Sequence, residues 1–357
     1  MHNPTSEITV LPLPMIRQDK QGSWGYAAGR TWVLERNLLG KAGMERLNTA
    51  TSQEDIRRIL LEHHYPQKST VEAMIVNEYD AAYAFLKEVE PDDGFRTVLL
   101  LPRDAHNLKV FLKEELQGDD ARPFDALKPS LFGTTLVDPE TLYDAVHGVK
   151  KDIKAPDWVF AVIQRAREAY NRHYDAAVID LSVDRDTETM RARLAEMLNA
   201  PWFSRALAMR RDLTNYETLL RSRLRGVSES QFLFSLLPSG IISETVWQQL
   251  FDAEKGEVKI ALAGTPYAAM SDYVDTYGDE GSAAAFFQDA ERLLAQEIAK
   301  GKLEVADVRR VLYYVLTRTI EIRYARMALA RVGLAAKNMN LSDESVSLLD
   351  GCEVVGD

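Results

Sequence analysis

The chain has 357 residues, of which 46% are hydrophobic, and its formal net charge is −11 at pH 7. This length allows two or three domains with hydrophobic cores, and the composition is that of a folded protein. The acidic balance argues against a general nucleic-acid-binding protein, because phosphate recognition needs concentrated Lys and Arg. The single cysteine, Cys352, excludes an intrachain disulfide and a cysteine-based zinc site, which fits a reducing cytosol.

The first 21 residues predict an extended N-terminal arm. In "MHNPTSEITVLPLPMIRQDK" prolines interrupt a short apolar stretch, and no basic start precedes a hydrophobic core, so a signal peptide is not expected. No run in the chain approaches the ~18 apolar residues of a membrane-spanning helix. We therefore expect a cytoplasmic protein, and any membrane association must be peripheral.

Apolar residues recur with helical spacing over most of the chain, notably over residues 71–89, 159–177 and 286–298. From residue 282 to 333 there is no proline and only Gly301 interrupts, which predicts two long antiparallel helices. Short connections are expected at "EPDDG", "GDDARPF", "LPSG" and "YGDEG". Because alternating strand patterns are scarce, the sequence predicts an all-α fold.

Two short patterns invite an enzymatic interpretation. "GYAAGRT", residues 25–31, is one residue shorter than a phosphate-binding loop, has Arg30 where the lysine belongs, and lies in a helical pattern. Asp144 and His147 have a spacing that can bring both side chains to one metal, but the second such pair of a helical-bundle metal site is missing. We expect no catalytic residue, no cofactor and no metal.

One phrase occurs twice, and a weaker copy follows. Asp104 and Asp212 each have Asn three residues later, Leu eight residues later and a cation nine residues later, and Glu321 stands at nearly the same interval again. Such spacing is what a threefold internal repeat requires. The residues of this motif are Asp104, Asn107 and Leu112; Asp212, Asn215 and Leu220; and Glu321, Tyr324 and Leu329.

A second phrase follows the same order, with apolar residues spaced by five and then three positions. Its copies are Leu39, Met44 and Leu47; Val137, Leu142 and Ala145; and Ile242, Trp247 and Leu250. Asp138 and Ser243 are candidate N-caps of the helices that begin there. We therefore predict an arm at 1–21, helical repeats at 22–120, 121–229 and 230–340, and a tail at 341–357, with the C-terminal helix packing back on the first repeat.

The repeated helix has a structural interpretation. We expect Asp104 and Asp212 in the first helical turn, at the positive end of the helix dipole. Asn107 and Asn215, one turn later, are expected to bond a neighbouring helix or its loop. The run that holds Arg210, Arg211, Arg221, Arg223 and Arg225 is either a solvated helix face or an anchor for a partner, and Arg221, Arg223 and Arg225 are the candidate partner contacts.

These segments together resemble a known family, the C subunits of V-type and archaeal-type ATPases, which are equivalent to the d subunit of the eukaryotic vacuolar enzyme. The resemblance extends from about Trp24 to about Leu349 and rests on "WGYAAGRTWVLERNLLGKAGMERLNTATSQEDIRRILLEHHY", "DAHNLKVFLK", "DLTNYETLLR", "SLLPSGIISETVWQQL" and "LTRTIEIRYARMALARVGLAAKNM".

The resemblance implies a funnel of three similar helical bundles around a pseudo-threefold axis. It implies a non-catalytic central-stalk subunit, a socket that seats the rotor shaft on the membrane proteolipid ring and transmits torque for ATP-linked proton or sodium transport. Two alternatives stay open on the residues alone. One is a helical enzyme with a site around Asp144 and His147, and the other is a helical scaffold for soluble partners.

Overall fold

The protein is described by a computed structural model that covers residues 11–18, 22–148, 152–305 and 307–336. Within these residues the chain forms helices and connections, and no β-strand occurs apart from an isolated bridge between Tyr277 and Asp279. The predicted all-α class is therefore confirmed. The predicted arm and tail lie partly or wholly outside the described residues.

The helices follow one another with short connections. The α-helices are α1 (Trp24–Leu34), α2 (Gly40–Thr49), α3 (Gln53–Glu62), α4 (Val71–Val89), α5 (Gly94–Glu115), α6 (Phe124–Leu127), α7 (Pro139–His147), α8 (Asp157–His173), α9 (Ala177–Met197), α10 (Pro201–Arg225), α11 (Glu229–Ser235), α12 (Glu244–Asp252), α13 (Lys255–Ala263), α14 (Tyr273–Thr276), α15 (Ser282–Ala299) and α16 (Val308–Ala336). Short 3-10 helices are η1 (Glu35–Asn37), η2 (Gly118–Asp120), η3 (Lys128–Ser130), η4 (Ala268–Met270) and η5 (Lys300–Leu303).

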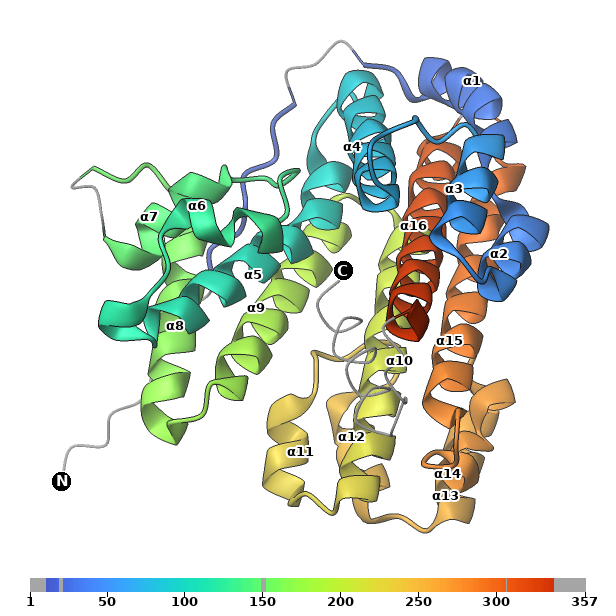
Figure 1. The fold of residues 1–357 in the computed structure, drawn as a ribbon. Coiled ribbons are helices and arrows are strands. Elements are labelled where there is room, and N and C mark those ends of the chain that lie inside the picture. Colours follow the sequence, from blue (N-terminus) through green and yellow to red (C-terminus); the bar gives the residue numbers. More distant parts are fainter. Residues whose placement is uncertain (1–10, 19–21, 149–151, 306, 337–357) are drawn as a thin grey trace, which may run out of the picture.

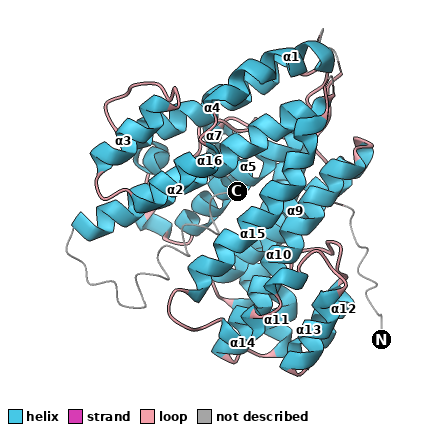
Figure 2. Cartoon of the chain, turned by 90° about the vertical axis from the view of Figure 1, so that its right-hand side faces the viewer, coloured by secondary structure: helices cyan, strands magenta, loops and turns pink. Residues whose placement is uncertain are grey.

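The helices form three groups, which Figure 1 shows at the upper right, at the left and at the lower right. In the N-terminal group, α16 packs against α1, α2, α3 and α4. In the middle group α5 packs on α7 and α9, and α8 packs on α9; in the C-terminal group α10 packs on α11, α12 and α15. Contacts of α9 with α10 and of α15 with α16 join the groups, and Figure 2 shows the long helices from the side.

Two hydrophobic cores hold these groups together. The first is continuous through the N-terminal and middle groups, where Leu108, Trp158 and Val315 are among its buried members. The second lies inside the C-terminal group and includes Tyr216 and Trp247. Because the first core crosses from one group to the next, those two groups are packed as one body.

Most expected helices occur where the spacing places them. The apolar patterns over 71–89 and 286–298 correspond to α4 and α15. The pattern over 159–177 is divided between α8 and α9, because Tyr174 adopts a positive φ of 53° and ends α8. Asp138 and Ser243 cap α7 and α12 through their side chains, as predicted.

The two long helices predicted after residue 282 are also confirmed. α15 ends at Ala299, η5 turns the chain around Gly301, and α16 returns along α15. A Cβ atom on Gly301 would lie 2.6 Å from the carbonyl oxygen of Arg309. Glycine is required because the backbone of η5 approaches the first turn of α16 so closely.

The expected position of the repeated acids is wrong. α5 begins at Gly94 and α10 begins at Pro201, so Asp104 and Asp212 lie in the middle of long helices and not in their first turns. α5 continues through Pro102, which has no N–H to donate to the carbonyl of Val98. Arg191 of α9 supplies the missing donor, with its Nε 3.0 Å from that oxygen.

Substitution Gly301→Ala tests the close approach at this turn. We expect it to lower the free energy of unfolding by about 1–3 kcal/mol, because the added methyl group overlaps the Arg309 carbonyl. Gly29→Ala is the control, since Gly29 is an exposed residue of α1 with open space around its Cβ position, and it should raise stability by about 0.5–1 kcal/mol. Urea unfolding measures both changes, and equal effects would contradict the explanation.

Candidate partner interface

Asp104 joins the middle of α5 to the loop that leads into α7. Its two carboxylate oxygens accept hydrogen bonds from the backbone N–H groups of Leu136 and Val137, both at 2.9 Å. One turn later Asn107 accepts from the N–H of Phe132 and donates to its carbonyl, again at 2.9 Å. The loop therefore pairs its backbone with side chains of the long helix, which compensates for burying both.

The same arrangement recurs in the C-terminal group. Asp212 of α10 accepts from the N–H groups of Ile241 and Ile242 at 2.7 and 3.1 Å. Asn215 accepts from the N–H of Leu237 at 2.8 Å and donates to its carbonyl at 3.2 Å. The expectation that both asparagines bond a loop is confirmed.

The third acid, Glu321 of α16, reaches back to the start of the chain. It accepts from the N–H of Gly40 at 3.0 Å and forms an ion pair with Arg318, also at 3.0 Å. Arg318 donates in turn to the carbonyl of Asn37 at 3.1 Å. Tyr324 is half-buried and forms no hydrogen-bond pair with a loop backbone among the described residues. In this copy Arg318, and not the residue three positions after the acid, bonds the loop.

Other motif residues support these contacts. Leu112 and Leu220 are buried, and Leu329 packs partly buried against the first core. The hydroxyl of Tyr267 donates to Asp212 at 2.8 Å, and the Tyr65 ring lies 5.0 Å from the Arg318 guanidinium. Each acid thus binds the loop that starts the second phrase, although the division into three repeats stays a proposal.

Burial has an electrostatic consequence at these acids. It raises the pKa of Asp104 to about 7 and that of Glu321 to about 7, and it also raises the pKa of Asp212, while the backbone N–H donors oppose each shift. The loops are therefore held by carboxyl groups whose ionisation is coupled to folding.

The candidate arginine contacts are largely occupied within the chain. Arg221 donates to the hydroxyl of Tyr277 at 3.0 Å. Arg223 donates to the carbonyl of Ala253 at 2.8 Å, at the C-terminal end of α12, so the helix end that it binds belongs to this chain. Arg225 is exposed in the last turn of α10.

A hollow of about 180 Å³ lies where α5, α9, α10, α15 and α16 meet. We call it the outer hollow. All three groups of helices contribute to its wall, and charged side chains of both signs line it: Asp184, Glu188, Arg210, Arg211, Glu217, Arg221, Glu291 and Arg323. A wall of this kind offers many hydrogen-bonding groups to a protein partner.

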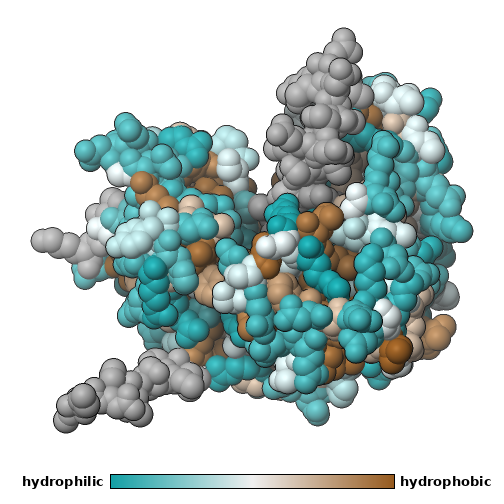
Figure 3. All heavy atoms as spheres, turned by 90° about the horizontal axis from the view of Figure 1, so that it is seen from below, coloured by the Kyte–Doolittle hydropathy of each residue, from teal (hydrophilic) through white to brown (hydrophobic). Residues whose placement is uncertain are grey.

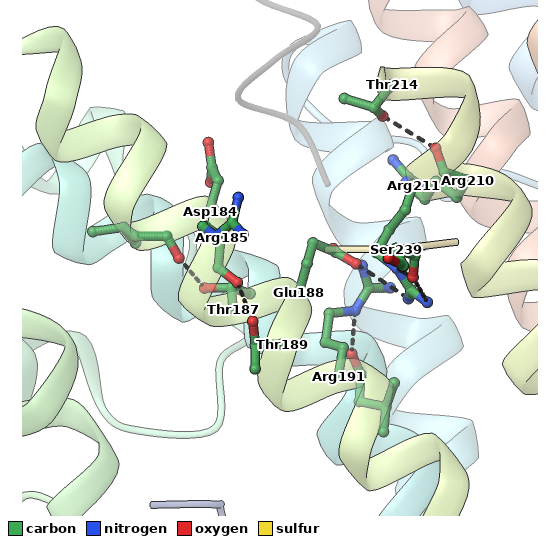
Figure 4. A network of polar contacts seen from close by, with 12 residues as sticks. Asp184, Arg185, Thr187, Glu188, Thr189, Arg191, Arg210, Arg211, Thr214 and Ser239 are labelled. Atoms are coloured by element: carbon green, nitrogen blue, oxygen red, sulfur yellow. Dashed lines mark hydrogen bonds and ion pairs between the residues drawn. The ribbon is translucent and has the colours of Figure 1, made fainter. Parts of the chain in front are cut away.

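A polar network fixes one side of the outer hollow (Figure 4). Glu188 of α9 pairs with Arg191 on the same helix and lies 3.8 Å from Arg211 of α10. Arg211 also donates through Nε and Nη2 to the carbonyl of Ser239, at 3.4 and 3.2 Å. Together with the bond from Arg191 to the carbonyl of Val98, these contacts connect α5, α9, α10 and the loop before α12.

Sequence reasoning missed the acids and Arg323 of the outer hollow, and Arg191 of the polar network beside it. Glu188, Arg191, Glu291 and Arg323 come from α9, α15 and α16 and carry no repeated signal. Arg103 and Arg211 do carry a repeated signal, because each directly precedes a repeated aspartate. Both therefore stand one position before the phrase that revealed the repeat.

The patterns that suggested an enzyme do not converge. "GYAAGRT" lies within α1. The Nδ1 atom of His147 is 3.0 Å from the carbonyl of Tyr143, and the two rings stack. Among the residues that the structure describes, no three His, Cys, Asp or Glu side chains are grouped so that they could hold a metal. Among the same residues, no helix has the length and apolar character needed to cross a membrane.

Substitution Asp212→Ala tests the loop attachment. It leaves the N–H groups of Ile241 and Ile242 and the hydroxyl of Tyr267 without their acceptor, and we expect a loss of roughly 3 kcal/mol or more in the free energy of unfolding. Asp272→Ala removes an exposed acid paired with Lys259 in the same group, and should change stability by less than about 1 kcal/mol. Comparable losses in the two variants would contradict the role of Asp212.

The raised pKa of Asp104 predicts a pH dependence. Its pKa is about 7 in the folded protein and near the ordinary 3.8 in the unfolded chain, so the folded state binds more protons between these values and stability falls as pH rises. Between pH 5 and 7, Asp104→Asn should make the decrease in the free energy of unfolding smaller by roughly 2–3 kcal/mol. Asn107→Ala, which removes a loop contact but no titrating group, should destabilise the protein equally at both pH values in the same urea titrations.

Comparison with known proteins identifies the family of this chain. The chain is similar to the C subunit of the V-type sodium ATPase of Enterococcus hirae, with 24% identity over 242 residues, which cover 66% of this chain and 72% of that relative. The family model described as ATP synthase (C/AC39) subunit matches residues 27–333. Because that match covers most of the chain, the protein belongs to the ATP synthase (C/AC39) subunit family.

Proposed function

We propose that this protein is a non-catalytic central-stalk subunit of a V-type ATPase or ATP synthase. In this role it is a socket that holds the rotor shaft and seats it on the membrane proteolipid ring. Torque passes through it during ATP-linked transport of protons or sodium ions. Membrane attachment is then peripheral, through the ring and on the cytoplasmic side.

The outer hollow is the observation that carries this proposal. Long helices of all three groups converge on it, so a side chain of a shaft that enters it would contact every group directly. Figure 3 shows the molecule from below, with hydrophilic residues over most of the face and hydrophobic residues interspersed among them. Such a surface suits contact with protein partners better than insertion into a bilayer.

Ion pairs between long helices support a stiff body, which torque transmission requires. Lys109 of α5 pairs with Asp184 of α9 at 2.8 Å. Glu291 of α15 pairs with Arg323 of α16 at 2.7 Å, where both side chains are largely buried. These pairs lie beside the outer hollow and connect the helices that form its wall.

We further propose that the three helix groups are repeats arranged around a pseudo-threefold axis as a funnel. The support is that Asp104 and Asp212 accept from N–H groups at matching positions of their loops, and that Glu321 accepts from the N–H of Gly40, one position later in its copy. In this arrangement each long acid-bearing helix belongs with the loop that it binds, and Glu321 completes the N-terminal group from the other end of the chain.

Co-purification from native membranes tests the proposed function. A tagged copy of the full chain should recover shaft subunits and the proteolipid ring in roughly one-to-one assembly, identified by mass spectrometry. Recovery of the chain alone, or with soluble partners only, would overturn the coupling role.

A cross-linking experiment tests the place of the shaft. Thr214 is exposed on α10 and lines the outer hollow, so Thr214→Cys in a Cys352→Ser background should cross-link to a shaft subunit in the assembled enzyme. Lys41→Cys, on the exposed face of α2 and outside the hollow, is the matched control and should give no shaft product. A shaft cross-link from Lys41→Cys alone would place the shaft elsewhere.

A further inference from the structure

A second, smaller cavity of about 60 Å³ adjoins the outer hollow. We call it the inner cavity. The two spaces share Pro102, Arg210, Leu294 and Arg323 in their walls. Four arginines line the inner cavity, namely Arg103, Arg191, Arg210 and Arg323, and none of the described residues that line it is acidic.

Arg103 is the buried cation of this cavity. It is 5% exposed, and its guanidinium carbon lies 3.9 Å from the centre of the Tyr79 ring and 4.2 Å from that of Phe132. Aromatic rings attract a cation but do not replace an oxygen acceptor for its N–H groups. The Nε and Nη1 atoms of Arg103 have no hydrogen-bond partner among the described residues.

The corresponding arginine of the other copy provides an internal comparison. Arg211 precedes Asp212 as Arg103 precedes Asp104, and Arg211 donates to the carbonyl of Ser239 and lies 3.8 Å from Glu188. Arg103 has no such acceptor in the described structure. The Nη1 atom of Arg211 has no hydrogen-bond partner among the described residues either. The two copies differ because Arg211 has a carbonyl acceptor for Nε and Nη2, whereas Nε and Nη1 of Arg103, which lines the inner cavity, have none.

Neighbouring acids do not fill this gap. Arg191 pairs with Glu188 and Arg323 pairs with Glu291, and both of these acids line the outer hollow and not the inner cavity. Asp104 directs both of its carboxylate oxygens to backbone N–H groups of the 136–137 loop.

A buried arginine without an acceptor is unfavourable, because hydrogen bonds to water are lost and not replaced. An anion in the inner cavity would restore them. The volume of about 60 Å³ exceeds the roughly 15 Å³ that a single water requires, so it accommodates a group of a few heavy atoms. A carboxylate has this size and accepts hydrogen bonds from arginine in fixed geometry.

We propose that the inner cavity is a carboxylate-binding site in which Arg103 is the principal ligand. The carboxylate comes from an acidic side chain of the protein partner that occupies the outer hollow. The existence of the site stands on the geometry of this chain, whereas the source of the carboxylate rests on the proposed function.

The isolated full-length chain tests the site itself, with acetate as the probe. Thermal unfolding is compared in sodium acetate and sodium chloride at equal ionic strength. In the wild type, acetate should raise Tm above its value in chloride, because a ligand that binds only the folded state stabilises it. Arg103→Met keeps an unbranched apolar side chain between the rings but removes the donors, and should abolish the acetate-specific shift.

Arg326→Met is the matched control. Arg326 also lies over the Phe132 ring, at 5.9 Å, but it does not line the inner cavity. This variant should keep the acetate-specific shift of the wild type. Arg103→Lys is a second variant, for use if Arg103→Met is poorly folded. It retains the positive charge and should show part of the acetate-specific shift in Tm. An acetate-specific shift that is absent from the wild type, or unchanged in Arg103→Met, would overturn the site.

Affinity for the shaft subunits tests the source of the carboxylate. Arg103→Met should weaken their binding about thirtyfold or more relative to wild type, whereas Arg326→Met should leave it within about threefold. Unchanged shaft affinity in Arg103→Met, together with a lost acetate shift, would overturn the partner as the source. If the wild type shows the acetate shift but recovers no shaft or ring from membranes, the proposed function fails and the site stands.

Discussion

The structure depends on one kind of contact, a buried acid in the middle of a long helix that accepts hydrogen bonds from the backbone of a loop. Asp104, Asp212 and Glu321 each form it. A loop pressed against a helix would otherwise bury N–H groups without acceptors, which is strongly unfavourable. The acid therefore allows a short helix to begin directly on the surface of a long one, and this positions α2, α7 and α12 against α16, α5 and α10.

The acid-bearing helices also contribute to the outer hollow. Residues of α5, α10 and α16 line it together with residues of α9 and α15. Arg191 shows how closely the helices depend on one another there, since one guanidinium serves both the carbonyl that Pro102 leaves without a donor and the carboxylate of Glu188. Arg191 thus connects α5 and α9 beside the outer hollow.

The candidate site was only partly predictable. The repeated asparagines were expected to bond loops, and they do, because their spacing from the acids places them one turn along the same helix face. The acids were expected at helix starts, which is wrong, because α10 begins at Pro201 and α5 begins at Gly94 and continues through Pro102, where Arg191 replaces the missing hydrogen bond. That compensation comes from a residue distant in sequence, so no local pattern could reveal it.

The amino-acid sequence alone predicts the all-α class, most helix positions, the caps at Asp138 and Ser243 and the residues of the repeated phrases. These features depend on apolar periodicity and local hydrogen bonds, which adjacent residues decide. Tertiary structure alone decided that Glu321 binds the loop at Gly40, and that Arg103 and Arg323 meet at one cavity. Such contacts depend on the packing of complete helices, because the path of each helix and its burial, and not its composition, select which charged groups come together.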